Sequence, residues 1–139
     1  QYCMAAEIAD KINDTYGDIL ALCKKQVAYT GLLTDGYYEL PIKGLLDYQL
    51  GKVSVLDLKI TNTKHINYSK IIDYMGYKNP MWLYKNLSCV KNASLLVYSI
   101  PDNSARLYPI DTNSPPDFFK IALCKRGKKI HVRDDNWGH

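Results

Sequence analysis

The chain has 139 residues, of which 47% are hydrophobic and 23% charged, the composition of one ordinary globular domain. No run approaches the 18 or so apolar residues of a membrane-spanning helix, and no signal-peptide pattern is present, so we expect neither a membrane partner nor export. The net charge of +4 favours a phosphate-rich partner but is too small to identify one. Because the chain begins with Gln1 rather than Met, we expect a fragment or a trimmed chain.

The cysteines indicate the compartment and exclude two kinds of metal site. The four of them are scattered without a C-x-x-C pair, which favours reduced thiols and a cytoplasmic location. The same scatter argues against a zinc or iron-sulfur site. These residues are Cys3, Cys23, Cys89 and Cys124.

The amino-terminal part of the chain predicts a helix followed by strands. Apolar residues recur at helical spacing from Cys3 to about Cys23. Glu7 lies beside this apolar stripe, where it can form an exposed pair with Lys11. A short strand over 25–30, a turn over 31–36 and a long strand over 37–49 follow. Pro41 interrupts the long strand and favours a bulge or an edge position there.

The stretch from Gly44 to Thr61, GLLDYQLGKVSVLDLKIT, predicts a β-hairpin, because two apolar runs flank a Gly-Lys turn signal. Each run carries one acid, Asp47 or Asp57, where a buried strand favours Val or Ile. Side chains alternate along a strand, so Asp57 and Lys59 share one face. The other face looks like core and carries Leu56, Leu58 and Ile60.

The two acids are expected to meet across the hairpin. A loop with an odd number of residues around Lys52 places Asp47 opposite Asp57, with Cβ atoms about 5 Å apart. Such carboxylates repel unless one is protonated, a cation lies close, or a divalent metal binds between them. Oxygen-only ligands favour Mg²⁺ or Mn²⁺ over zinc. The alternative is a solvated strand face on which Lys59 merely pairs with one acid.

The second half of the chain predicts helices and then strands. His65 lies in a polar loop over 61–67, where we expect it to be solvated rather than catalytic. Helices are predicted over 68–75 and from Pro80 to about Val90, with Asn79 as N-cap. Strands over 95–100 and 106–110, a linker over 112–116 and a helix over 117–123 follow. The basic tail is either a solvated terminus or a DNA-backbone contact, and contains Lys125, Arg126, Lys128, Lys129 and Arg133.

The hairpin resembles the core motif of the PD-(D/E)XK nuclease superfamily, in the branch of phage-type exonucleases and RecB-like nuclease domains. There a Gly-x-x-Asp strand precedes an apolar strand that ends in Asp/Glu-x-Lys, as Gly44, Asp47, Asp57 and Lys59 do here. Leu46 replaces the motif's proline. The resemblance implies an α+β fold with a restriction-endonuclease-like core, in which helices flank a central mixed β-sheet of about five strands. We expect this core over 1–111, with a linker and basic extension of the same domain over 112–139.

The resemblance also implies an activity, a metal and a partner. It implies a Mg²⁺- or Mn²⁺-dependent deoxyribonuclease of DNA recombination or repair, an exonuclease of phage or mobile-element type ahead of an endonuclease. DNA is the implied partner, and ring-forming relatives leave an oligomer open. Asp47, Asp57 and the backbone carbonyl of Leu58 would bind metal, and Lys59 would sit beside the attacking water. Glu7 would be a further ligand, with Glu39 as its rival.

Two alternatives stay open. Gly76, Tyr77 and Tyr84 match landmarks of the same family, but Pro80 stands where the family has a glutamine. This departure motivates a catalytically inactive nucleic-acid-binding domain of the same fold. In the other alternative the chain is an unrelated α+β binding module in which the Asp57-x-Lys59 triplet is accidental.

Overall fold

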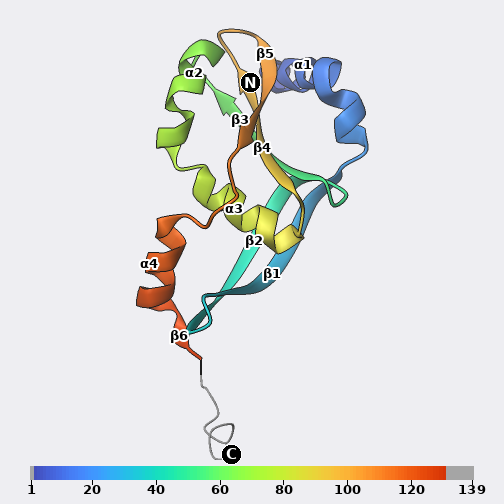
Figure 1. Ribbon diagram of the computed structural model, residues 1–139. Helices are drawn as coiled ribbons and strands as arrows, with labels where there is room; N and C mark the ends of the chain where they lie inside the picture. Colours follow the sequence, from blue (N-terminus) through green and yellow to red (C-terminus); the bar gives the residue numbers. More distant parts are fainter. Residues whose placement is uncertain (1, 131–139) are drawn as a thin grey trace, which may run out of the picture.

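The computed structural model describes residues 2–130 and has one mixed β-sheet with helices on both faces (Figure 1). Among these residues, no helix is long and apolar enough to cross a membrane. The elements in chain order are α1 (Tyr2–Ala21), β1 (Lys24–Thr34), β2 (Tyr38–Leu50), β3 (Ser54–Thr61), α2 (His65–Ile71), the 3-10 helix η1 (Ile72–Met75), α3 (Lys78–Ser88), β4 (Asn92–Ser99), β5 (Ser104–Ile110), α4 (Asp117–Arg126) and β6 (Lys128–Lys129).

The strand order is β1-β2-β3-β4-β5, and the short strand β6 pairs with β2. All neighbours are antiparallel except β3 and β4, which run parallel. A parallel pair needs a crossover connection, and α2, η1 and α3 supply it. The expected α+β fold, with a mixed sheet of about five strands flanked by helices, is therefore confirmed.

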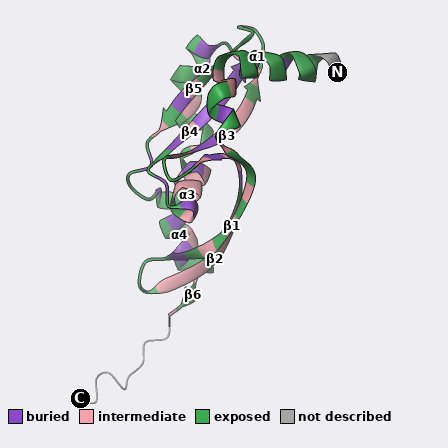
Figure 2. Cartoon of the chain, turned by 90° about the vertical axis from the view of Figure 1, so that its right-hand side faces the viewer, coloured by how far each residue is buried: buried purple, intermediate pink, exposed green. Residues whose placement is uncertain are grey.

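Each face of the sheet has its own hydrophobic core. Helix α1 covers one face, where Ile8 and Ile12 pack with Leu56 and Leu96. Helices α2 and α3 cover the other, where their buried residues pack with Val55, among others. The strand β4 is buried on both faces, as its continuous apolar run Leu95 to Val97 requires (Figure 2).

The ribbon formed by β1 and β2 extends beyond the rest of the sheet, and we call it the arm. It carries the third hydrophobic cluster, in which Leu33 packs against Phe119 and Leu123 of α4. Trp82 of α3 joins this cluster, with its ring 5.0 Å from that of Phe119. The basic C-terminal segment is thus folded onto the arm as far as Ile130, whereas Arg133 lies outside the described residues.

Two local predictions differ from the structure, and at Pro41 one of the two expected alternatives is found. The segment expected as a turn over 31–36 continues β1 through Thr34, and the turn itself is capped by Asp35, whose carboxylate accepts two backbone N–H bonds. Asn79 is not the N-cap of α3, because the helix begins at Lys78. The β1–β2 register runs unbroken past Pro41, so no bulge forms there. Pro41 does occupy an edge position, since β3 pairs only with the far end of β2.

Glycines in the arm allow α3 to lie directly on it. A Cβ atom built on Gly44 would lie 2.9 Å from Cε1 of Tyr84 and 3.2 Å from Cδ1 of Leu87. A Cβ built on Gly31 would lie 2.9 Å from Leu87. Gly44, the first residue of the Gly-x-x-Asp stretch, therefore has a packing role of its own: it places Tyr84 against β2.

We expect Gly44→Ala to lower the free energy of unfolding by about 1–3 kcal/mol, because the added methyl group overpacks the contact with the Tyr84 ring. Urea denaturation measures this. Gly17→Ala is the matched control, since its Cβ would lie 3.6 Å from the nearest neighbouring atom inside α1. This control should raise stability by about 0.5–1 kcal/mol. A Gly44→Ala protein as stable as the parent would contradict the close packing.

Candidate active site

The site lies at a fork where β2 and β3 separate. These strands pair only from Tyr48↔Leu56 to Leu50↔Ser54, and Asp47 and Asp57 are the next residue on each strand. The connecting loop has three residues, Gly51 to Val53, and Gly51 adopts a left-handed φ of 52°. The expected odd-length loop is therefore present, and its register brings the two aspartates level with each other.

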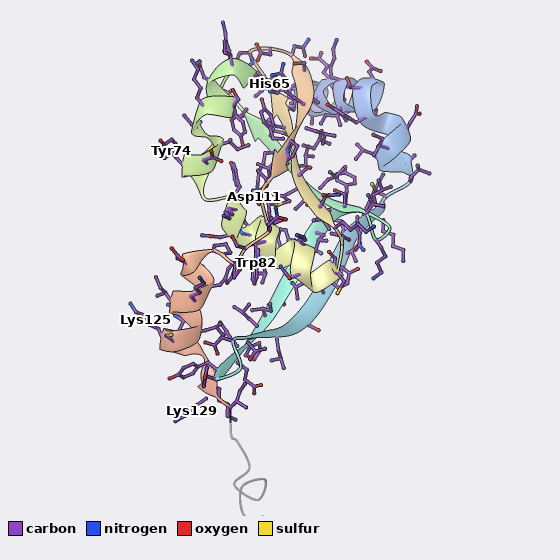
Figure 3. The ribbon with its side chains drawn as sticks, in the orientation of Figure 1. His65, Tyr74, Trp82, Asp111, Lys125 and Lys129 are labelled. Atoms are coloured by element: carbon purple, nitrogen blue, oxygen red, sulfur yellow. The ribbon has the colours of Figure 1, made fainter. Side chains whose placement is uncertain are left out.

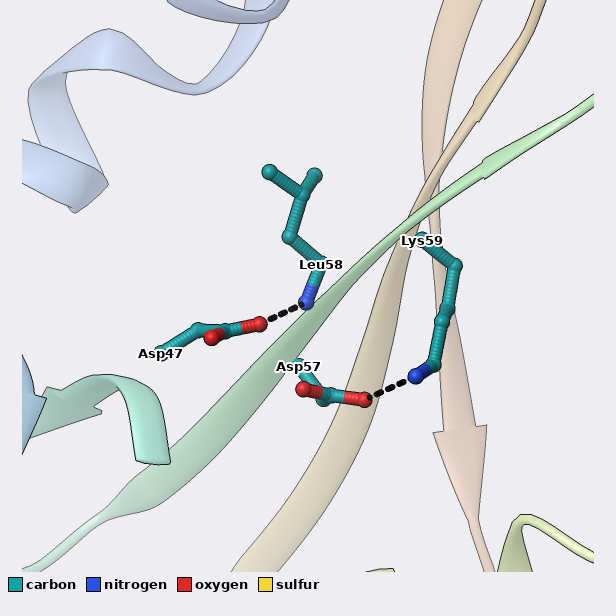
Figure 4. Close-up of polar contacts among 4 residues, drawn as sticks. All are labelled: Asp47, Asp57, Leu58 and Lys59. Atoms are coloured by element: carbon teal, nitrogen blue, oxygen red, sulfur yellow. Dashed lines mark hydrogen bonds and ion pairs between the residues drawn. The ribbon is translucent and has the colours of Figure 1, made fainter. Parts of the chain in front are cut away.

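The Asp47 carboxylate holds the fork in place. Its Oδ2 accepts a hydrogen bond from the backbone N–H of Leu58 at 2.8 Å (Figure 4). In a continued antiparallel ladder this N–H would donate to a backbone carbonyl of β2. The Asp47 side chain takes over that acceptor role, so β2 can separate from β3 without leaving the Leu58 N–H unpaired. On the other side of Asp47, Gln26 of β1 has a left-handed φ of 53°, so the backbone of β1 is distorted at the position opposite Asp47.

Asp57 and Lys59 form an ion pair on the β3 face that packs under α2 and α3. The distance from Lys59 Nζ to Asp57 Oδ2 is 2.9 Å, and the side chains are 37% and 15% exposed, respectively. Leu58 points the opposite way, toward α1 (Figure 4). The predicted alternation is thus confirmed, although Ile60 on the α1 face is 53% exposed rather than buried.

The pKa values reflect two carboxyl groups in close proximity. Burial raises the pKa of Asp57, the neighbouring Asp47 carboxyl raises it further, and Lys59 only partly offsets both. Burial by itself lowers the pKa of Lys59, but its hydrogen bond to Asp57 and the Asp57 charge outweigh that effect and hold the pKa above its ordinary value. The two aspartates therefore carry more negative charge than Lys59 alone neutralises.

Tyrosines form the wall of the site. The Lys59 ammonium lies 5.4 Å from the centre of the Tyr77 ring. Burial raises the pKa of Tyr84, and the nearby Asp57 charge adds to the effect. Tyr68 is almost fully buried, and its hydroxyl oxygen has no hydrogen-bond partner among the described residues. Sequence reasoning singled out Tyr77 and Tyr84 but missed Tyr68, whose helical position gave no sign that it reaches the site.

Neither glutamate expected as a further ligand joins the two aspartates. Glu7 is exposed on α1, which covers the opposite face of the sheet from Asp57. Glu39 lies eight residues before Asp47 on β2, at most about 26 Å along the strand, and is paired in register with Lys128. Accordingly, the described residues contain no group of three or more His, Cys, Asp or Glu side chains arranged to hold a metal ion. The expected three-acid set is replaced by a pair.

The donor atoms at the fork nevertheless fit a hard divalent cation. The Leu58 N–H contacts only Oδ2 of Asp47, and the Lys59 ammonium contacts only Oδ2 of Asp57. The other oxygen of each carboxylate is not engaged by these two groups. The N–H and C=O of one strand residue point to the same edge, so the Leu58 carbonyl faces Asp47 as its N–H does. An all-oxygen set of one or two carboxylates completed by water is the usual environment of Mg²⁺.

His65 is not the solvated loop residue we expected. Its ring is buried at the start of α2, and Nε2–H donates to the backbone carbonyl of Ser104 at 2.9 Å. The other ring nitrogen, Nδ1, lies 2.7 Å from the Tyr108 hydroxyl. The His65 backbone N–H donates to Asp102 at 2.6 Å. This residue therefore ties α2 to β5 and stands apart from the two aspartates.

The raised pKa of Asp57 predicts how stability depends on pH. A folded-state pKa above the ordinary 3.8 means that the folded protein binds this proton more tightly than the unfolded chain. Stability from this group is fully present below pH 3.8 and is lost as pH rises through the raised pKa. In metal-free protein, the stability of Asp57→Asn relative to the parent should therefore increase over this window.

Urea unfolding at a series of pH values from acid to neutral measures this difference. Asp14→Asn, an exposed carboxylate on α1, is the matched control for removing one acid. If the difference in unfolding free energy between Asp57→Asn and the parent stays constant across the series, the raised pKa of Asp57 is contradicted.

Comparison with known proteins adds a likeness of fold. No protein-family model and no curated protein sequence matches the chain. The crystal structure of SSO0001 is similar with a TM-score of 0.56 and 20% identity, covering 86% of this chain and 56% of that one. A protein from Eubacterium rectale named "putative exonuclease" is similar with a TM-score of 0.59 and 19% identity, covering 86% and 47%. This chain thus spans about half the length of each, and the likeness to both is one of fold.

Proposed function

We propose that this chain is a metal-dependent nuclease that hydrolyses phosphodiester bonds in DNA, with a PD-(D/E)XK site and with exonuclease action of phage or mobile-element type as the first candidate. The observation that carries the proposal is the fork, where Asp47 lies level with Asp57 and Asp57 is ion-paired with Lys59. Two separate features produce this arrangement. The three-residue loop sets the register of the hairpin, and the Asp47 carboxylate replaces a backbone acceptor for the Leu58 N–H. The likeness of fold to the "putative exonuclease" supports it.

The residues at the fork suit the charges of phosphodiester hydrolysis. When bound by Asp47, Asp57 and the Leu58 carbonyl, Mg²⁺ or Mn²⁺ supplies Lewis-acid polarisation of the phosphate and a water of lowered pKa. Lys59 supplies a fixed positive charge for the phosphate oxygens as their negative charge grows. Its raised pKa keeps it as an ammonium at neutral pH, and the ion pair with Asp57 keeps it pointed at the site.

A second candidate is a domain of the same fold that binds nucleic acid without cutting it. Two observations favour it: Pro80 occupies the position of the family's glutamine, and Glu7 is on the far face of the sheet. DNA retention in a gel-shift experiment, with no cleavage in Mg²⁺ or Mn²⁺, would select this candidate. Failure to bind either DNA or divalent metal would leave the accidental-motif alternative.

Digestion of end-labelled linear DNA in Mg²⁺ tests the nuclease. We expect Asp57→Asn to reduce cleavage to background, and Lys59→Ala to lower the rate by about 10²–10³-fold through loss of its charge. Asp14→Asn, which removes an exposed carboxylate from α1, should leave the rate unchanged. Equal cleavage by the parent and the Asp57→Asn protein would overturn the site.

Calorimetric titration with Mn²⁺ tests the metal separately from cleavage. The parent should bind, and Asp47→Asn should lose the binding heat, because the amide keeps an oxygen acceptor for Leu58 N–H but carries no charge. Glu7→Gln and Glu39→Gln are the matched controls and should bind as the parent does. A flat titration of the parent would contradict the carboxylate pair as a metal site.

A further inference from the structure

The positive charge of the molecule is concentrated at one end, which we call the basic end. Residues 117–130 contain five Lys or Arg against one Asp, a net charge of +4 that equals the formal net charge of the whole chain. All five cationic side chains are exposed, and they are Lys120, Lys125, Arg126, Lys128 and Lys129. Figure 3 shows Lys125 and Lys129 at the end of the molecule farthest from α1.

The basic end is held rigidly to the strand that carries Asp47. Phe119 and Leu123 anchor α4 in the arm cluster, and β6 pairs with Tyr38 and Glu39 of β2. The Ile130 backbone N–H extends this pairing by donating to the Tyr37 carbonyl at 2.9 Å. The cationic groups are therefore fixed relative to the fork through one continuous strand, unlike the side chains of a loose tail.

Stability of the fold does not account for this charge. The carbonyl end of α4 favours cations at Lys125 and Arg126, but β6 lies beyond the helix. Among the described residues only Lys120 of the basic end has an ion-pair partner, Asp117 at 3.9 Å. Lys128 is paired in register with Glu39, but Lys125, Arg126 and Lys129 have no ion-pair partner among the described residues. These three like charges repel one another, so an anionic partner would relieve a cost that the fold otherwise bears.

The other end of the molecule has the opposite charge. Helix α1 carries four acids and one lysine, a net charge of −3, and lies across the molecule from α4 (Figure 1). A highly charged anionic polymer is attracted to one end and repelled from the other. Such a polymer reaching the fork would therefore run along the arm toward α4 and β6.

We propose that the basic end binds the phosphate backbone of duplex DNA whose terminus lies at the fork, an inference that rests on the proposed function. Along β2, the pairing partner of Lys128 lies at most about 26 Å from Asp47. With a rise of about 3.4 Å per base pair, this span corresponds to about eight base pairs. The basic end thus selects duplexes longer than about eight base pairs and does not contact shorter ones.

Fluorescence anisotropy with labelled DNA hairpins tests the contact, using stems of about 6 and about 16 base pairs and a salt series in EDTA. The variant is Lys125→Gln, Arg126→Gln and Lys129→Gln together; Lys128 is kept because Glu39 faces it. The matched control neutralises three exposed lysines elsewhere, Lys11, Lys24 and Lys91. Circular dichroism verifies that both triple variants are folded.

The variant should bind the long stem about tenfold more weakly than the parent. The slope of log K against log salt should fall by about three, one unit for each lost phosphate contact. Its affinity for the short stem should equal that of the parent, and the control should keep both the affinity and the slope. Three outcomes would each overturn the proposal. The first is an equal loss of affinity in the variant and the control, and the second is an equal loss on both stems. The third is the same affinity loss and salt dependence with a single strand of the same length.

The absence of divalent metal separates this test from the nuclease assay. If Asp57→Asn binds the long stem as the parent does and only the basic-end variant loses affinity, the contact is supported whether or not cleavage is found. If the parent cleaves DNA but the basic-end variant binds the long stem as tightly as the parent, the contact is overturned and the nuclease stands.

Discussion

The hydrogen bond from the Leu58 N–H to the Asp47 carboxylate is the interaction on which the arrangement of the site depends. A strand that leaves its neighbour exposes donors and acceptors, and buried ones are costly. By accepting from Leu58, Asp47 lets β2 turn away from β3 directly beside Asp57. The departure of β2 in turn creates the arm, and the arm receives α3, α4 and β6. One carboxylate thus serves both the topology of the sheet and the charge of the candidate site.

A second constraint is the close contact between α3 and the arm. Gly31 and Gly44 have no side chains to hold the helix away, so Leu87 and Tyr84 settle on the backbone of β1 and β2. Tyr84 then lies within the field of the Asp57 charge, which contributes to its raised pKa. The buried aromatic wall lowers the local polarity around the two acids, and desolvation is accordingly the largest cause of the raised pKa of Asp57.

Local pattern predicted the hairpin well because its determinants are local. Alternation placed Asp57 with Lys59, and the turn signal at Gly51 set the register that brings Asp47 level with Asp57. Features determined by distant residues were beyond that reasoning. The burial of His65 depends on partners some forty residues away, as its bonds to Ser104 and Tyr108 show. Helical spacing located Glu7 on α1 correctly but contains no information on which face of the sheet that helix covers.

The attachment of the arm has a consequence for cooperativity. Only three residue pairs join β2 to β3, whereas β3 and β4 are paired along their whole length. Local opening is favoured at a sparse connection of this kind, so we expect the arm to open there before β3 and β4 separate, against the packing of Leu46 with Val55 in the shared core. Asp47 and Asp57 lie on opposite sides of that connection. A ligand held by both would bind only the closed form, and amide exchange in the arm would slow by a factor of one plus the ratio of free ligand concentration to Kd.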